Sequence, residues 1–423
     1  MRLRLAAPLL AAMVLGSPAL AHAEPGDELT ISVLTFGPGD HPFFKFGHNA
    51  IWVHDEARKR DRVFNYGTFL FDSPALIPTF LRGKLRYWLS EQSLRGTIAG
   101  YHRENRTIDA QEIDLSPAER RQMLAALEDN LKDENKYYKY DYYQDNCSTR
   151  VRDMVDRFTG GRLHEASTMP ARMTWRSHTL RLIADDLPFY LGLNLAMGDL
   201  IDKPIDVWKE MFLPARLQET LRTATRPNTD GSTRPLVKSE RRLLEAERAP
   251  VRSEPPRWML PFGLAGLGIG GLLALLGDAS RKATAARVVF GILTSLLGLV
   301  LGLLGLIFVM FWVATDHQVA HRNENILQCA PWAIVLAGSG IGVARRKVAS
   351  THRAYVFALA ALLASALGLL AKLLPWFDQV NGQLIALLLP IWAGLTFGLR
   401  RLSLAIVPLA PAEPTTRPVV DEI

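Results

Sequence analysis

The sequence predicts an α+β domain followed by an all-α transmembrane domain of about five helices. Two features of the 423-residue chain support this division. Hydrophobic residues make up 48% of the chain, and nearly all of the long apolar runs lie after Trp258. Before that point, short segments in which apolar and polar residues alternate, as in strands, give way to segments with helical spacing. A chain of this length is expected to form two or three domains.

Residues 1–23 have the three parts of a secretory signal peptide. Arg2 and Arg4 form a basic start, residues 5–15 form an apolar core, and Ala-His-Ala at residues 21–23 gives a cleavage site between small residues. The apolar core is too short to span a bilayer. No cysteine follows the cleavage site, so the protein is not expected to be a lipoprotein itself. The mature chain is expected to begin near Glu24.

Residues 24–223 are expected to form the α+β domain. Strand patterns occur at residues 29–36, 47–53 and 62–67, with weaker ones at 85–89 and 107–113. The period of two in the second strand fixes the face on which His48 lies. Ser116, Pro117 and Glu119 have the spacing of a capped helix start. Residues 224–256 are rich in proline and charge and are predicted to be a linker, with one short helical segment around residues 241–247.

Residues 257–400 are predicted to form the transmembrane domain, and residues 401–423 a tail. The apolar spans are residues 258–277, 288–314, 331–344, 354–374 and 383–399. The third span is short for a complete crossing, which takes about 20 residues. Basic residues gather in alternate loops: Arg281, Lys282 and Arg287 in one, Arg345, Arg346, Lys347 and Arg353 in another, and Arg400 and Arg401 after the last span. The positive-inside rule then puts residues 24–257, 315–330 and 375–382 outside and the C-terminus in the cytoplasm.

The net charge of +7 does not indicate nucleic-acid binding. Much of the excess positive charge lies in the predicted linker and in the short loops between apolar spans. Such loops carry lysine and arginine for reasons of membrane topology. We therefore expect the membrane, and no nucleic acid, among the partners.

Cys147 is a candidate nucleophile because it stands at a helix start. Val151, Val155 and Phe158 recur at helical spacing from it, and glycines at 160–161 end the pattern. The helix dipole and unpaired backbone N–H groups favour an anion at such a position, so the thiol is expected to be acidified. The alternative is a small buried apolar residue, since free cysteines are often simply packed. A catalytic thiol also needs a base and a group that orients it, and His48 and Asn65, on successive predicted strands, supply both types.

The motifs around these residues resemble those of a known family. They are Phe46–Asn49, Phe64–Phe69 and Asp145–Arg150, with further matches at 192–194, 211–214, 315–317 and 323–325. They resemble the Lnb-type periplasmic domain of bacterial lipoprotein N-acyltransferases, which is similar to circularly permuted papain-like enzymes of the NlpC superfamily. The resemblance implies a papain-like periplasmic domain on the bacterial inner membrane. It also implies Cys147 as nucleophile and His48 as base, with Asn65 as the third member.

Polar residues near Cys147 and in the outer loop at 315–330 are candidates for substrate binding. They are Tyr143, Asn146, Asp316, His317, Asn323 and Asn325. The alternative for the loop residues is an ordinary solvated rim. His317 and His321 with Cys329 lack a convincing fourth ligand, so no metal is expected, and no cofactor is implied. A disulfide between Cys147 and Cys329 is conceivable in an oxidising periplasm, although it would silence the thiol.

The resemblance implies a membrane-bound thiol acyltransferase. It would move a fatty acyl group from a glycerophospholipid, through a thioester on Cys147, to the N-terminal amine of a lipoprotein. Two alternatives stay open: a periplasmic cysteine hydrolase of peptidoglycan peptides, and a non-enzymatic envelope assembly factor. A five-span anchor is more than a hydrolase of soluble peptides needs, and the presence of both His48 and Cys147 weighs against a scaffold.

Overall fold

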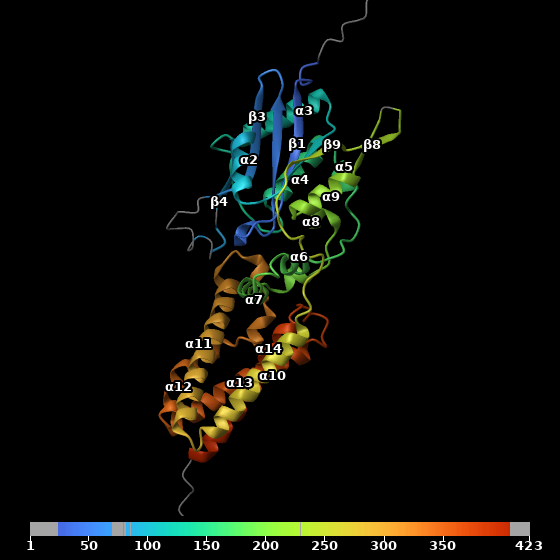
Figure 1. The fold of residues 1–423 in the computed structure, drawn as a ribbon. Helices are drawn as coiled ribbons and strands as arrows, with labels where there is room; N and C mark the ends of the chain where they lie inside the picture. Colours follow the sequence, from blue (N-terminus) through green and yellow to red (C-terminus); the bar gives the residue numbers. More distant parts are fainter. Residues whose placement is uncertain (1–23, 70–78, 80–81, 85, 229, 407–423) are drawn as a thin grey trace, which may run out of the picture.

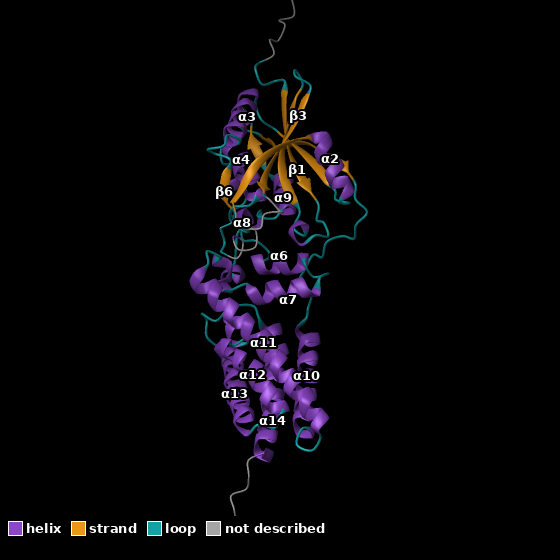
Figure 2. Ribbon diagram, turned by 90° about the vertical axis from the view of Figure 1, so that its left-hand side faces the viewer, coloured by secondary structure: helices purple, strands orange, loops and turns teal. Residues whose placement is uncertain are grey.

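The computed structural model describes residues 24–69, 79, 82–84, 86–228 and 230–406. A sheet-containing domain lies at one end of the molecule and a bundle of long helices at the other, with helices α6 (Trp175–Leu182) and α7 (Leu187–Ala196) between them (Figures 1 and 2). The predicted fold class, an α+β domain followed by transmembrane helices, is confirmed. The predicted signal peptide, and the tail from residue 407 on, lie outside the described residues.

The strands of the first domain form an antiparallel sheet. Its described strands are β1 (Leu29–Phe36), β2 (His48–Asp55), β3 (Arg60–Thr68), β4 (Arg86–Ser93), β5 (Ile108–Ile113), β6 (Tyr137–Lys139) and β9 (Val237–Leu244). They are arranged in the order β6-β4-β3-β2-β1-β5-β9. The final residue of β1, Phe36, is paired with the first residue of β2, His48. The five strands that the sequence pattern predicts are therefore present, within a few residues of their expected ends.

The two faces of the sheet pack against different helices. Ile51 and Phe64 lie in the core beneath α4 (Cys147–Phe158), together with Val151 and Val155 of that helix. Ala50 and Trp52, next to these in sequence, belong to the core beneath α2 (Leu94–Arg103) on the other face. This alternation is what the period of two requires. Helix α3 (Pro117–Asn130) begins with the predicted capping box, in which the side chains of Ser116 and Glu119 each bind the other's backbone N–H.

The C-terminal part of this domain, where a linker was predicted, differs from the prediction. Helices α5 (Arg162–Glu165), α8 (Val207–Glu210) and α9 (Pro214–Thr223) precede a small hairpin of β7 (Thr225–Pro227) and β8 (Thr233–Pro235). Residues 237–244 then form β9, a strand paired with β5, so the predicted linker is partly sheet and the predicted helix around 241–247 is wrong. Most side chains of β9 are exposed, and Arg242 pairs with Asp109 at 2.8 Å. Backbone pairing and ion pairs stabilise this edge strand. Neither produces an apolar periodicity in the sequence, so the sequence did not predict it.

The second domain is a helical bundle in which the predicted third span belongs to a bent pair of helical segments. Its long helices are α10 (Met259–Ala279), α11 (Thr284–Ala314), α13 (Val348–Ala371) and α14 (Gly382–Ile406), and the shorter α12 is Val335–Ala344. Among the described residues, the four long helices could cross a membrane. A fifth span would combine Gln318–Leu327 with Pro331–Ala344, two pieces bent by 65°. Small residues let α10 and α14 touch, since a Cβ on Gly394 would lie 1.9 Å from the carbonyl oxygen of Gly270.

The C-terminal end of α7 joins the two domains. Arg176 of α6 is 1% exposed and donates to the carbonyl oxygens of Asn194 (3.2 Å), Met197 (3.0 Å) and Gly198 (2.8 Å), while it pairs with the buried Asp202 at 2.7 Å. Three amide side chains of the second domain donate to the same helix end. They are Asn323 to Leu195, Asn325 to Asn194 and Leu195, and Gln379 to Met197. The last carbonyls of a helix have no partner within it, so this cluster, which we call the α7 clamp, satisfies them from both sides.

Removal of Arg176 should test the α7 clamp. In Arg176→Ala, the buried carboxylate of Asp202 loses its partner and carbonyls at the end of α7 lose their donors. A loss of about 3–5 kcal/mol in the free energy of unfolding is expected for a buried pair broken on one side. Thermal unfolding in one detergent should show a clearly lower Tm, whereas Arg172→Ala, at an exposed arginine nearby, should not. Equal Tm values for the two variants would contradict the clamp.

Candidate functional site

The site lies where the sheet domain meets the helical bundle. Two chain segments border it, the loop before β2 and the segment before β4, and both contact the region between the domains. Lys45, just before β2, pairs with Asp185, just before α7, at 2.6 Å. Gly83, just before β4, lies against Asp316 in the loop after α11, and Asp316 N–H donates to the carbonyl of Arg82. The end of the sheet at which β2 begins therefore faces the bundle.

Cys147 is the first residue of α4, and its thiol lies beside the start of β2. Asn146 caps the helix, because its Oδ1 accepts from the N–H groups of Ser148 (2.8 Å) and Thr149 (2.9 Å). Backbone N–H groups of Asn49, Ser148 and Cys147 itself donate to the sulfur. The pairing of β2 with β3 ends at Ile51 and Phe64. The N–H of Asn49 is thus turned to the thiol instead of to a neighbouring strand.

The predicted acidification of the thiol is wrong for the protein without substrate. Cys147 is 9% exposed, and burial raises the pKa of its thiol above the usual value, although the three N–H groups and the positive charge of Arg106 oppose the rise. The helix start does direct N–H groups at the sulfur, as the sequence predicts. Removal of water from the thiolate outweighs them. The resting site therefore holds a neutral thiol.

His48 and Asn65 are in direct contact. Burial, and to a smaller extent the charge of Arg106, lower the pKa of His48 to about 4, while a hydrogen bond with the Asn65 side chain raises it. A bond that favours the protonated imidazole identifies Asn65 as the acceptor. This fits its Nδ2 donating to the Val63 carbonyl at 3.3 Å. The two residues are diagonal neighbours on one face of the β2–β3 pair, so the predicted third residue does face the predicted base.

Two further residues act on this site. Asn49 supplies a backbone N–H to the sulfur, and its side chain is anchored to Thr35 (2.9 Å) and to the carbonyl of Leu34 (3.2 Å). Arg106 is 2% exposed, donates to the Gly37 carbonyl at 2.8 Å and carries the charge that acts on both His48 and Cys147. Asn49 stands in the first matched motif and could have been found there. No sequence signal marks Arg106, which follows α2.

Tyrosine side chains form one wall around the thiol. Gly67 has a φ of +90°, and a Cβ added to it would lie 3.4 Å from the Cβ of Cys147, 3.8 Å from Tyr140 Cε2 and 3.9 Å from the Tyr138 hydroxyl. Tyr140 in turn stacks on Tyr87, with ring centroids 4.1 Å apart. The tyrosine-rich segment before Cys147 thus encloses the thiol and contributes to its burial.

Four of the six candidate substrate-binding residues are internal. The Tyr143 hydroxyl bonds with Thr179 at 2.8 Å, Asn146 caps α4, and Asn323 and Asn325 belong to the α7 clamp. Their side chains are at most 4% exposed, so we do not propose them as ligands. Asp316 and His317 lie in the loop after α11, where Asp316 pairs with Lys139 at 3.0 Å.

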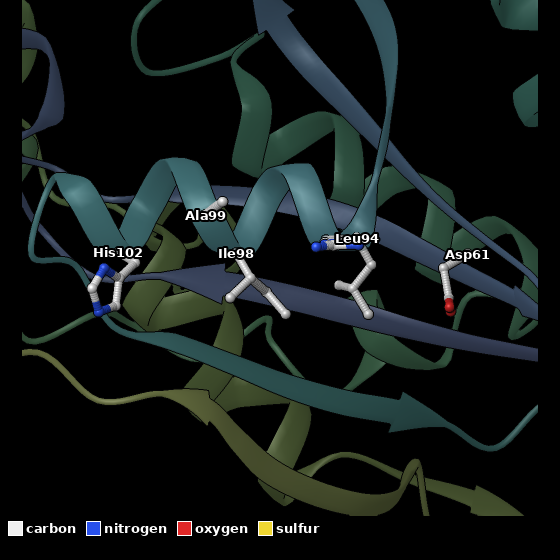
Figure 3. Close-up of a pocket in the computed structure, with 6 residues that line it drawn as sticks. Asp61, Leu94, Ile98, Ala99 and His102 are labelled. Carbon is white, nitrogen blue, oxygen red and sulfur yellow. The ribbon is translucent and has the colours of Figure 1, made fainter.

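Other candidate sites are distinct from this one. Cys147 and Cys329 are both free, which excludes the disulfide in this structure. Among the described residues, no group of three His, Cys, Asp or Glu side chains could hold a metal ion. The open hollow in Figure 3, of about 480 Å³, lies along α2 and is lined by residues such as Leu94, Ile98 and His102. It includes neither His48 nor Cys147.

Comparisons with known proteins match both parts of the chain. The model of the Lnb N-terminal periplasmic domain matches residues 19–184, and the model of the Lnb transmembrane domain matches residues 271–397. The comparison with curated proteins and the comparison with solved structures find no match.

The reactivity of Cys147 with iodoacetamide should report its raised pKa. A thiol whose pKa lies above its ordinary value is protonated at neutral pH, and the thiolate forms only as the pH rises through the raised value. In a Cys329→Ser background, the alkylation rate should be low at pH 7 and climb only at pH values above the ordinary thiol pKa of about 8.5. A rate that already reaches a plateau between pH 5 and 7 would indicate a resting thiolate and contradict this assignment.

Proposed function

The chain belongs to the Lnb family, and from this premise we propose that it is a membrane-bound thiol acyltransferase. In this proposal it transfers a fatty acyl group from a glycerophospholipid to the N-terminal amine of a bacterial lipoprotein, through a thioester on Cys147. The match to both Lnb domains supports a multi-pass inner-membrane protein with a periplasmic domain.

One observation carries the proposal. A buried thiol with N–H donors lies beside the start of β2, and the first residue of that strand, His48, is hydrogen-bonded to Asn65, at the end of the sheet that faces the membrane helices. Nucleophile, base and orienting group are the parts that covalent catalysis by a thiol needs. Because they lie at the end of the sheet that faces the membrane helices, we place them at the membrane surface in this proposal. This placement favours a lipid substrate over the peptidoglycan peptides of the alternative hydrolase.

In the first half-reaction, His48 removes the thiol proton as the Cys147 sulfur attacks an ester carbonyl of the donor. Asn65 accepts a hydrogen bond from the imidazole and stabilises its protonated form. The tetrahedral intermediate then expels the lysophospholipid alcohol, which takes the proton back from His48. Acyl group and enzyme remain joined as a thioester.

Backbone N–H groups stabilise the negative charge that develops on the carbonyl oxygen. The N–H of Ser148 is shared between the sulfur and Asn146 Oδ1, which it contacts at 2.8 Å. We therefore assign the oxyanion to the N–H groups of Cys147 and Asn49, which converge on the sulfur. In the second half-reaction, the neutral amine attacks the thioester carbonyl, the amine proton passes to His48, and the amide leaves as the thiol is restored.

Burial suits this sequence of steps. A neutral thiol and a neutral imidazole carry no charge that must be held in a dry site between turnovers. The charged pair forms only during attack, when the N–H donors and Asn65 stabilise it. Exclusion of water also protects the thioester from hydrolysis until the amine arrives.

We further propose that the C-terminus lies in the cytoplasm. This follows from the basic loops, which alternate along the five spans. Alkaline phosphatase fused near residue 320 should be active and a fusion near residue 415 inactive, because the enzyme folds only in the periplasm. The reverse pattern at either position would overturn the orientation.

An acyl thioester on Cys147 should accumulate when the acceptor is withheld. Protein in detergent micelles with phosphatidylglycerol should gain the mass of a fatty acyl group at Cys147, and neutral hydroxylamine should remove it. Cys147→Ser should lose the adduct. His48→Ala should slow its formation by about 10²–10⁴-fold, the usual contribution of a general base.

Cys329→Ser provides the control, since this residue lies in the core of the helical bundle. It should form the adduct at the normal rate. An adduct on Cys329, or one that survives neutral hydroxylamine, would rule out the thioester route.

A further inference from the structure

A basic hollow lies between the edge of the sheet and the loop after α11. Its volume is about 410 Å³, and it is lined by Lys84, Arg86, Tyr137, Tyr138, Lys139 and Asp316. Arg86 and Lys139 face each other across the β4–β6 pair. The hollow is thus built from one edge of the sheet domain and closed by a residue of the membrane domain.

Positive charge predominates in this hollow. Three cationic side chains line it against the single carboxylate of Asp316. Lys139 pairs with Asp316 at 3.0 Å, and the Arg86 guanidinium lies over the Tyr137 ring at 4.6 Å. Lys139, and to a smaller extent Lys84, lower the pKa of the Asp316 carboxyl. Two of the three cations therefore act on the one carboxylate, which leaves an excess of positive charge for an anionic ligand.

The hollow lies beside the end of a long apolar helix. Helix α11 ends at Ala314, two residues before Asp316. Trp312 and Val313, at this end of the helix, are 46% and 76% exposed. Tryptophan is enriched where the hydrocarbon core meets the headgroups. A ligand in the hollow would therefore lie at the depth of the phosphate groups of the surrounding leaflet.

Tyr138 connects the hollow to the thiol. Its side chain lines the hollow, and its hydroxyl lies against Gly67 on the side that Cys147 also touches. Among the described residues, this buried hydroxyl has no hydrogen-bond partner. Buried hydroxyl groups normally have one, so we treat this hydroxyl as a candidate donor to a ligand in the hollow.

We propose that the hollow binds the phosphate group of the phospholipid acyl donor and so holds an ester carbonyl over Cys147. Lysine and arginine are the usual partners of phosphate oxygens. In a glycerophospholipid, the phosphate and the acyl esters are attached to the same glycerol. A phosphate in the hollow would therefore bring an ester close to the thiol, because Tyr138 lies between the two. A diacylglyceryl lipoprotein has no phosphate, so the hollow would separate donor from acceptor. This inference rests on the proposed function.

The test compares two donors and two matched double variants. Initial rates of adduct formation on Cys147 are measured with phosphatidylglycerol and with the phosphate-free diacylglycerol. Lys84→Gln/Arg86→Gln should raise the KM for phosphatidylglycerol about tenfold or more, as loss of charge-assisted hydrogen bonds does. The KM for diacylglycerol should not change. Arg58→Gln/Lys59→Gln removes the same charge from the exposed turn between β2 and β3 and should change neither.

A variant with the opposite expected effect on the KM provides a second test. Asp316→Asn removes the one carboxylate among the described residues that line the hollow and should lower the KM for phosphatidylglycerol. Free inorganic phosphate at millimolar concentration should compete only weakly, because a lipid headgroup is also held by its chains. Strong competition would assign the hollow to soluble phosphate. Equal effects of Lys84→Gln/Arg86→Gln on both donors, or none on either, would overturn the proposal.

Direct binding separates this proposal from the proposed function. Native mass spectrometry of the detergent-solubilised protein should detect bound phosphatidylglycerol, less of it in Lys84→Gln/Arg86→Gln and the usual amount in Arg58→Gln/Lys59→Gln. If the wild type forms no thioester from either donor, the acyltransferase proposal fails while this binding result still decides whether the hollow takes a phospholipid. Equal retention by both double variants would refute the hollow as a lipid site.

Discussion

The C-terminal end of α7 is the constraint on which the arrangement of the molecule depends. Its unpaired carbonyls are bound from one side by Arg176 of α6 and from the other by Asn323, Asn325 and Gln379 of the helical bundle. Each of these donors is buried, so to break the α7 clamp would leave polar groups without partners. The clamp therefore fixes the sheet domain relative to the membrane helices, and with it the position of Cys147 relative to those helices.

Burial of Cys147 and His48 determines the electrostatics of the site. Burial raises the pKa of Cys147 and lowers that of His48, so both are neutral before reaction. The helix start and Arg106 partly offset the cost of an anion at Cys147 but do not remove it. Charge is expected only once a carbonyl is in place to receive the thiolate. A site of this kind acts on a substrate that displaces water, which suits a lipid ester delivered from the membrane.

The sequence predicted those features that have a local cause. The period of two placed His48 on its strand, and the spacing after Cys147 placed it at a helix start. Features that depend on distant parts of the chain were not accessible. Strand β9 is held by pairing with β5, and the raised pKa of the thiol comes from tyrosines and strands that enclose it. Asn323 and Asn325 looked like rim residues because nothing in the sequence shows that their partners are the carbonyls of α7.

The central claim is that this site transfers an acyl chain from a phospholipid to a lipoprotein. The most direct measurement uses proteoliposomes that contain the protein, a diacylglyceryl lipoprotein with a free N-terminal amine, and phospholipid with isotopically labelled acyl chains. Mass spectrometry of the N-terminal peptide should find the labelled chain as an amide with wild-type protein and not with Cys147→Ser. An unlabelled N-terminal amide, or equal labelling with Cys147→Ser, would contradict the account.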